Sequence, residues 1–147
     1  MPKPQLERRM IGALLRIPSQ AIVAAIYESL IKAGYDDLSP SHFVVFQHMH
    51  SEGIRSTELA EKAQMSKQAM GYLIAYLEEQ GYVERIPDPS DGRARLVRLT
   101  EQGWGVAEVA YSTVEQIEVK WENDLGAERM QQLRSILREL IAILGES

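Results

Sequence analysis

The stretch that decides the fold runs from residue 56 to residue 103, STELAEKAQMSKQAMGYLIAYLEEQGYVERIPDPSDGRARLVRLTEQG. It predicts two short helices, the first with Ser56 or Thr57 as its N-cap and the second beginning at Ser66 and ending on Gly81. The apolar spacing then changes to the alternation of strands in residues 82–86 and 93–99, on either side of a tip rich in Pro, Asp and Gly. Two helices followed by a hairpin outline a winged helix-turn-helix.

The second helix of this stretch has two different faces. Four apolar residues fall within one narrow arc and are expected to face the core: Met70, Leu73, Ile74 and Leu77. The opposite face carries Gln68, Tyr72, Ala75 and Glu79, with Gly71 and Tyr76 on the flanks. This face offers hydrogen-bonding and apolar groups with little bulk, which suits the major groove of DNA. An ordinary amphipathic surface helix would show the same pattern.

Two features could bind phosphate or a DNA groove. Ser66, Lys67 and Gln68 lie at the N-terminus of the second helix, where free N–H groups and the helix dipole attract anions. Arg93 and Arg95 fall on one side of the hairpin by strand alternation, and an arginine at the end of a narrow ribbon suits a minor groove. Asp91 could hold Arg93 or the recognition helix by a charge-assisted bond. A solvated turn is the alternative explanation of the tip.

Five segments together resemble the MarR (multiple antibiotic resistance regulator) family: STELA at 56–60, MSKQA at 65–69, LEEQGYVER at 77–85, DPSDGR at 88–93 and VRLTEQG at 97–103. The resemblance implies a homodimeric bacterial transcription regulator, with its recognition helix in the major groove and Arg93, supported by Asp91, in the minor groove. It departs from the family at Tyr72, Tyr76 and Gly92, where the family often has basic residues. Fewer charges predict a gentler salt dependence of binding. The residues expected to bind double-stranded DNA are Ser56, Thr57, Ser66, Lys67, Gln68, Ala69, Gly71, Tyr72, Tyr76, Asp91, Arg93 and Arg95.

The expected fold is mainly α, a single domain over 1–147 in which three short helices and a hairpin wing (about 39–103) lie between long dimerisation helices (about 1–34 and 104–147). Residues 5–33 read as one helix that Pro18 should kink or break and Gly34 should cap. Ser39 and Pro40 begin the next helix, which should stop near Gly53, and Thr100 begins the long helix after the wing. The flanking helices carry more apolar side chains than the small winged core can bury. A two-fold pairing around Leu6–Ile17 and Leu133–Leu144 is therefore expected, although packing within one chain explains part of the pattern.

The resemblance also implies a small aromatic or phenolic effector between the dimerisation helices and the winged core. Residues that could line its site are Tyr35, His42, Phe46, His50, Trp104 and Tyr111, which combine aromatic walls with polar tips. The alternative is that these aromatic residues are plain core. The chain has no cysteine, so thiol oxidation cannot be the switch.

Composition limits the function classes. The chain has 147 residues and a net charge of −5, but between Arg55 and Arg98 seven basic residues balance seven acidic ones. The longest apolar run, residues 21–27, is too short for a membrane span, and residues 1–9 lack the layout of a signal peptide, so a cytoplasmic protein is expected. The sequence contains no nucleophile motif and no cofactor loop. It also lacks a metal-ligand set, since His48 and His50 point to different sides of a helix and no cysteine assists. An enzyme, a cofactor and a metal are not expected. The rival classes are an interaction module that no longer binds DNA, and a ligand-binding or catalytic helical bundle.

Overall fold

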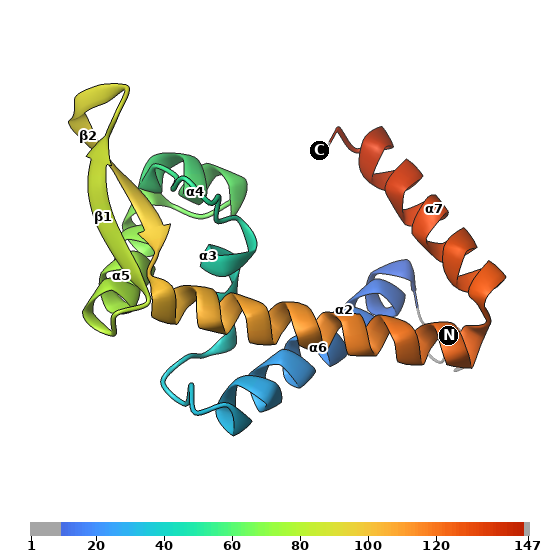
Figure 1. Cartoon of the computed structure of the whole chain (residues 1–147). Helices are drawn as coiled ribbons and strands as arrows, with labels where there is room; N and C mark the ends of the chain where they lie inside the picture. The colour runs from blue at the N-terminus through green and yellow to red at the C-terminus, as the bar shows by residue number, and fades with distance from the viewer. Residues whose placement is uncertain (1–9, 146–147) are drawn as a thin grey trace, which may run out of the picture. The chain divides into compact units, whose positions relative to one another are not determined.

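The computed structural model describes residues 10–145, which form a mainly helical chain with one antiparallel hairpin (Figure 1). The elements are, in order, α2 (Ile11–Lys32), the 3-10 helix η1 (Pro40–His42), α3 (Phe43–Gln47), α4 (Ser56–Lys62), α5 (Lys67–Glu79), β1 (Val83–Asp88), β2 (Asp91–Leu99), α6 (Glu101–Leu125) and α7 (Ala127–Ile143). This confirms the predicted winged helix-turn-helix between long helices. The chain divides into two compact units, one ending at Tyr111 and one beginning at Ser112, and α6 contributes to both. The predicted helix start at residues 5–9, with Leu6 of the predicted seam, lies outside the described residues.

Three of the predicted helix starts are confirmed by their hydrogen bonds. The Ser66 hydroxyl accepts the Ala69 N–H at 3.0 Å, and the Thr100 hydroxyl accepts the Gly103 N–H at 3.2 Å. Ser39 caps η1 in a reciprocal capping box with His42. The start of α4 was predicted wrongly, because Arg55 is its N-cap and Ser56 is already helical. The reason is tertiary: Ile54 pairs with Val97 of the wing, which holds Arg55 extended and lets the helix begin at once.

Three other boundaries differ from the expectation. α2 runs continuously through Pro18, which removes a single hydrogen bond from a helix of 22 residues, so of the predicted kink or break the break does not occur. α3 stops at Gln47, well before Gly53, because the chain turns there to bring Ile54 beside β2. The hairpin tip shrinks to Pro89 and Ser90, since the strands extend to Asp88 and Asp91. The Gly34 cap is confirmed by its φ of 96°.

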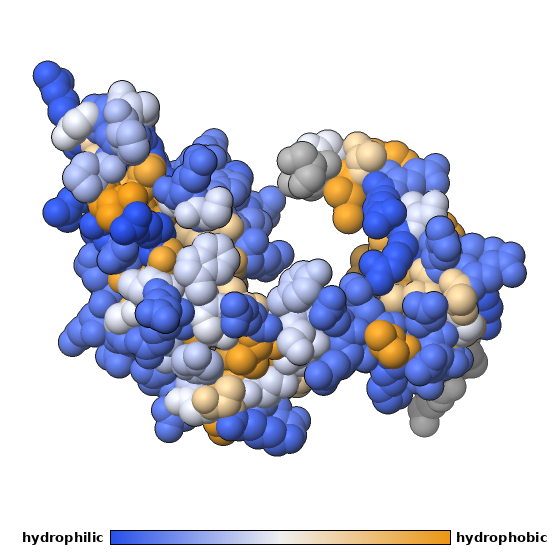
Figure 2. Space-filling view, viewed as in Figure 1, coloured by the Kyte–Doolittle hydropathy of each residue, from blue (hydrophilic) through white to orange (hydrophobic). Residues whose placement is uncertain are grey.

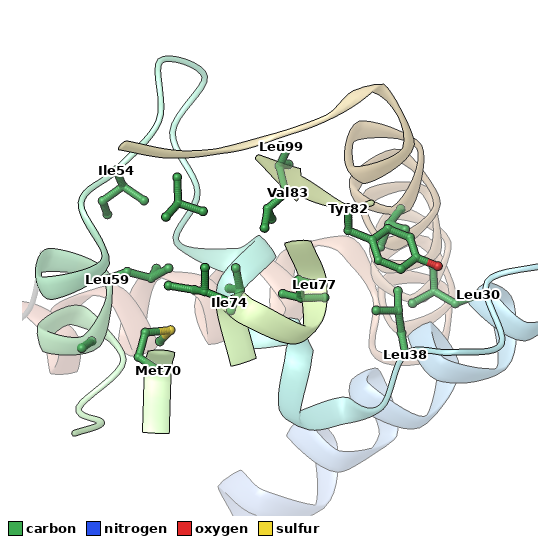
Figure 3. Close-up of a cluster of buried hydrophobic side chains, with 14 residues drawn as sticks. Leu30, Leu38, Ile54, Leu59, Met70, Ile74, Leu77, Tyr82, Val83 and Leu99 are labelled. Atoms are coloured by element: carbon green, nitrogen blue, oxygen red, sulfur yellow. The ribbon is translucent and has the colours of Figure 1, made fainter. Parts of the chain in front are cut away.

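The core of the first unit collects side chains from nearly every element around α5 (Figure 3). Met70, Ile74 and Leu77 are fully buried, and Leu73 packs at the edge of the same cluster, so the predicted inner arc is confirmed. Leu59 of α4 and Val83 of β1 reach the same cluster. The outer face of α5 is thereby left to the solvent.

The second unit consists of the second half of α6 and the whole of α7. Gly126, whose φ angle is 92°, joins the two helices. Met130 is its one residue in the buried hydrophobic set of the described chain, and an ion pair of 2.8 Å joins Arg134 to Glu118. Five large apolar residues of α7 and its C-cap residue Leu144 are exposed; those of the helix are Leu133, Ile136, Leu140, Ile141 and Ile143. Figure 2 shows such hydrophobic side chains at the surface over α7.

α2 is also an exposed apolar helix. Its exposed large residues are Ile11, Leu14, Leu15, Ile17, Tyr27 and Ile31. By length and composition it is apolar enough to cross a membrane, with a mean hydropathy of 1.3 over 18 residues, of which 6% are buried. Counting uninterrupted apolar runs missed this helix, because scattered polar residues such as Ser19 and Gln20 break a run and lower the average only slightly.

Candidate nucleic-acid interface

The first half of the candidate interface is the outer face of α5. Gln68, Tyr72, Ala75 and Glu79 are all exposed, and the exposed fraction of Tyr72 is 68%. Lys67, also exposed, stands in the first turn, immediately after the Ser66 cap. Polar side chains and free backbone N–H groups therefore meet at the start of a 13-residue helix whose other face is anchored in the core. This end of α5 can present both base-reading and phosphate-binding groups.

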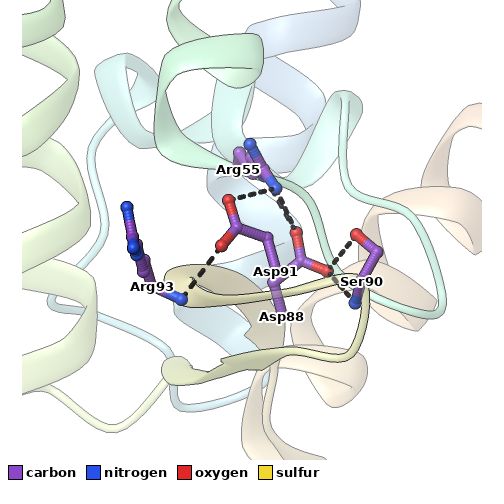
Figure 4. A network of polar contacts seen from close by, with 5 residues as sticks. All are labelled: Arg55, Asp88, Ser90, Asp91 and Arg93. Carbon is purple, nitrogen blue, oxygen red and sulfur yellow. Dashed lines mark hydrogen bonds and ion pairs between the residues drawn. The ribbon is translucent and has the colours of Figure 1, made fainter.

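The second half is the wing, whose tip is tied to the start of α4 by Arg55 (Figure 4). The Arg55 guanidinium donates to Oδ2 of Asp88 from Nε at 2.9 Å and lies with Nη2 at 2.8 Å from the same oxygen. The same Nη2 lies 3.6 Å from Oδ2 of Asp91. One arginine thus joins two carboxylates that stand on opposite strands of the hairpin.

The carboxylates in turn fix the backbone of the tip. Oδ1 of Asp88 accepts the Ser90 N–H at 2.9 Å and the Ser90 hydroxyl at 2.8 Å. These two bonds and the Arg55 guanidinium lower the pKa of Asp88 to about 2. Asp91 accepts the N–H of Arg93 at 3.0 Å, so it holds the backbone of Arg93 and leaves the guanidinium free. Of the two roles predicted for Asp91, the structure shows support of Arg93, through its main chain.

The wing arginines divide into paired and unpaired ones. Arg98 lies 2.6 Å from Glu84 across the hairpin, and Arg85 lies 3.5 Å from Glu78 of α5. Within residues 10–145, the side chains of Arg93 and Arg95 make no ion pair, and both are exposed. Two uncompensated positive charges at the end of a braced ribbon are suited to a groove of high negative potential.

Comparison with known proteins decides what this arrangement is. A model of the MarR family matches residues 36–94. The HTH-type transcriptional repressor Rv2887 of Mycobacterium tuberculosis is 31% identical over 131 residues, which cover 88% of this chain and 87% of that protein. The chain belongs to the MarR family. It is a transcriptional regulator by membership, with the winged helix-turn-helix of that family.

Two solved structures agree with this assignment. The reduced form of Escherichia coli MarR has a TM-score of 0.74 at 25% identity and covers 91% of this chain and 98% of its own. CouR from Rhodococcus jostii, solved with p-coumaroyl-CoA bound, has a TM-score of 0.68 at 25% identity over 88% of this chain and 90% of its own. Both similarities extend well beyond the winged core.

The other residues that the sequence predicts to bind DNA lie at the starts of α4 and α5 or on the flank of α5. Thr57 is exposed, and Ser56, Ala69 and Gly71 are partly buried at the starts of α4 and α5. Tyr76 is different, because its hydroxyl donates to the main-chain oxygen of Asp37 and its ring stacks on His42. That hydroxyl is occupied inside the protein.

The six predicted effector residues all lie in the first unit, where their surroundings differ. Tyr35 and Phe46 pack around Tyr82, with ring centroids 6.2 and 6.3 Å from its own. A Cβ on Gly105 would collide with the Tyr35 hydroxyl, so α6 is closely packed at that point. His50 lies with Nε2 3.1 Å from Nζ of Lys62. Trp104 and Tyr111 are exposed by 42% and 69%.

Four residues that matter to the interface were missed from the sequence. Arg55 and Asp88 brace the wing, and Asp37 and Tyr82 bond to each other beneath α5. Asp88 stands before a Pro-Ser turn, which is a signal for a side chain that accepts turn N–H groups and could have singled it out. Arg55 and Asp37 lie 33 and 45 residues from their partners, and no local pattern announces such pairs.

Proposed function

We propose that this MarR-family protein represses transcription by binding a pseudo-palindromic operator as a homodimer. The observation that carries the proposal is the pair of unpaired arginines, Arg93 and Arg95, on a wing that Arg55 braces beside an open α5 face. A purely structural wing has no need of two uncompensated charges at its tip. Major-groove readout by α5 and minor-groove insertion of Arg93 account for both features.

The homodimer is supported by the apolar surface that one chain leaves uncovered. α2 and α7 each present a row of exposed aliphatic side chains, which in a soluble protein marks an interface. A second copy would cover both rows and would set two recognition helices about one turn of DNA apart. The same pairing accounts for the apolar α2 without a membrane, and we place the protein in the cytoplasm as one domain with dimerisation helices at about 1–34 and 104–147.

We extend the proposal to a small aromatic or phenolic effector. The support is chemical, namely the aromatic side chains of Tyr35, Phe46, Trp104 and Tyr111 in the first unit. CouR, with a similar fold, holds an aromatic acyl-CoA. An effector releases DNA only through its different affinities for the free and the DNA-bound protein. It would therefore bind the free protein more tightly than the operator complex.

A second candidate is an interaction module of the same fold that no longer binds DNA. Tyr72 and Glu79 favour it, because they place an aromatic ring and a negative charge on the face that would meet DNA. No feature described in residues 10–145 favours an enzyme.

The test begins with selection of bound fragments from random duplex DNA by the full chain. Arg93→Ala should then weaken binding to the selected operator by about 1–3 kcal/mol, or roughly 5- to 150-fold, at fixed salt. Its melting temperature should not change, because the Arg93 side chain is exposed and makes no ion pair with any residue from 10 to 145. Arg98→Ala is the matched control, an exposed arginine of the same strand already paired with Glu84. Unchanged affinity of Arg93→Ala would refute the minor-groove role, and failure to select any DNA would favour the interaction module.

A further inference from the structure

We propose that Tyr76 is a positioning residue that locks the C-terminal half of the recognition helix to the segment between α2 and η1. Because Tyr76 contacts Asp37 and His42, the position of α5 depends on the position of the segment between α2 and η1. The fit of the outer face of α5 to the operator then depends on that segment too. The inference rests on the proposed DNA binding of α5 and adds a role for a side chain that the sequence assigns to DNA contact.

The hydrogen bond and the ring contact of Tyr76 are both made away from the outer face of α5. Its side chain is half-buried on the flank, between exposed Ala75 and buried Leu77. The hydroxyl donates to the main-chain oxygen of Asp37, and the ring lies parallel to that of His42, with centroids 4.6 Å apart and an interplanar angle of 8°. A hydrogen bond and a stacked ring therefore hold one side chain of α5 at two points.

Asp37 also accepts a hydrogen bond from a second tyrosine, which lies just after α5 in the chain. Tyr82, two residues after the end-cap of α5, donates its hydroxyl to Oδ1 of Asp37. Burial, reinforced by this bond to the carboxylate, raises the pKa of the Tyr82 hydroxyl, so it remains a donor at neutral pH. Asp37 thus accepts one hydroxyl from within α5 and one from just beyond it. This arrangement fixes the C-terminal end of the helix.

We call the contacts of Tyr76 and Tyr82 with Asp37 and His42 the clamp, and its Asp37–His42 side is held by contacts of its own. The Ser39 N–H donates to Nδ1 of His42 at 2.9 Å, which orients the ring independently of Tyr76. Leu38, between Asp37 and Ser39, is 3% exposed and belongs to the core cluster. The segment 33–39 continues directly from the end of α2 at Lys32. A displacement of this segment has to move Tyr76 or break its bond.

The clamp explains why the hydroxyl of Tyr76 has no need of a DNA partner. Tyr72, one helical turn earlier, is the contrasting residue, because it is exposed and its hydroxyl lies 3.4 Å from Nε2 of Gln68 on the same face. The two tyrosines of α5 therefore have different tasks, one outward and one inward.

The test uses Tyr76→Phe, which removes the hydroxyl and keeps the stacked ring, and His42→Ala, which removes the stack from the other side. Each should lower affinity for the selected operator by about 3- to 10-fold, the effect of one hydrogen bond or ring contact. Affinity for a random duplex of equal length, and its salt dependence, should stay at the wild-type level, since no phosphate contact is lost. Hydrogen exchange of the free protein should accelerate in residues 33–42 and in the C-terminal half of α5. Tyr72→Phe is the control, expected to leave exchange in those segments unchanged.

Each other outcome overturns the proposal in a recognisable way. Equal losses on operator and random duplex in Tyr76→Phe, with unchanged exchange in 33–42, would make Tyr76 a direct DNA contact. Faster exchange with unchanged operator affinity in both variants would reduce the clamp to a stabilising contact. If the wild-type chain selects no DNA, the proposed function fails and the DNA role of Tyr76 fails with it, while the exchange data still report whether the clamp exists.

Discussion

The winged core and the terminal helices have similar apolar residues but differ in what covers them. Met70, Ile74 and Leu77 of α5 are fully buried by their own chain, whereas Ile136 and Ile143 of α7 are 62% and 74% exposed. The core is closed by elements that meet around α5 from several directions, including Leu30 of α2 and Val106 of α6. α7 belongs to a unit in which α6 is the other helix, and two helices alone can bury little more than one stripe each. An apolar stripe therefore indicates burial without saying which chain provides it.

The largest effect is expected where this difference is greatest, on α7. Ile136→Glu combined with Ile143→Glu should convert the proposed dimer to a monomer in sedimentation, because the exposed aliphatic row can no longer pair. The single chain should tolerate both charges, since neither side chain is buried in it. Gln132→Glu, a polar exposed position of the same helix, is the control and should leave the dimer intact. A wild-type chain that sediments as a well-folded monomer would remove the distinction between the two regions.

An intermediate effect is expected in the winged core. Leu77→Ala should reduce the free energy of unfolding by about 2–5 kcal/mol, as a cavity in a closed core does. This loss of unfolding free energy should not vary with protein concentration as long as the chain stays dimeric, since the contacts of Leu77 lie within one chain. Denaturant unfolding measures it, with Ala75→Ser on the exposed face of α5 as a control that should change little. A loss well under 1 kcal/mol would mean that the core relaxes around the missing side chain.

The smallest effect is expected on the pH dependence of the unfolding free energy, through His42, whose ring stacks on Tyr76 of α5. Burial lowers the pKa of His42 below its ordinary value of 6.5, and the nearby Asp37 carboxylate opposes part of that shift. The unfolded chain therefore takes up a proton at a higher pH than the folded one. The stabilising contribution is complete above pH 6.5 and is lost as the pH falls from there through the folded pKa.

This pH effect can be separated from that of the other histidines. His42→Phe keeps a ring beside Tyr76 and cannot titrate, so the decline in unfolding free energy below pH 6.5 should become shallower than in wild type. His48→Phe serves as the control. Identical slopes in wild type and His42→Phe would show that the ring titrates as freely in the folded chain as in the unfolded one.

Local sequence patterns predicted the helix-turn-helix and the wing because their physical causes are local. The arc of Met70, Ile74 and Leu77 follows from 3.6 residues per turn, and the caps at Ser66 and Thr100 follow from hydroxyls three residues before a free N–H. Exposure of Arg93 and Arg95 on one side of the hairpin follows from strand alternation. Where prediction failed locally, at Arg55 and at the end of α3, a pairing of Ile54 with the distant Val97 had set the boundary.

The sequence by itself determined the order of the elements and the buried face of α5, because each depends on residues a few positions apart, and its motifs indicated the family. The tertiary structure alone decided which polar groups work together. It placed Arg55 between Asp88 and Asp91 to brace the wing, and it turned Tyr76 away from the outer face of α5 onto Asp37 and His42. These partners stand 33 to 39 positions apart, and a charge or hydroxyl can satisfy itself with any suitable group that folding brings near. Spacing along the chain cannot rank such partners, since their choice is made by the packing of the helices and the hairpin around α5.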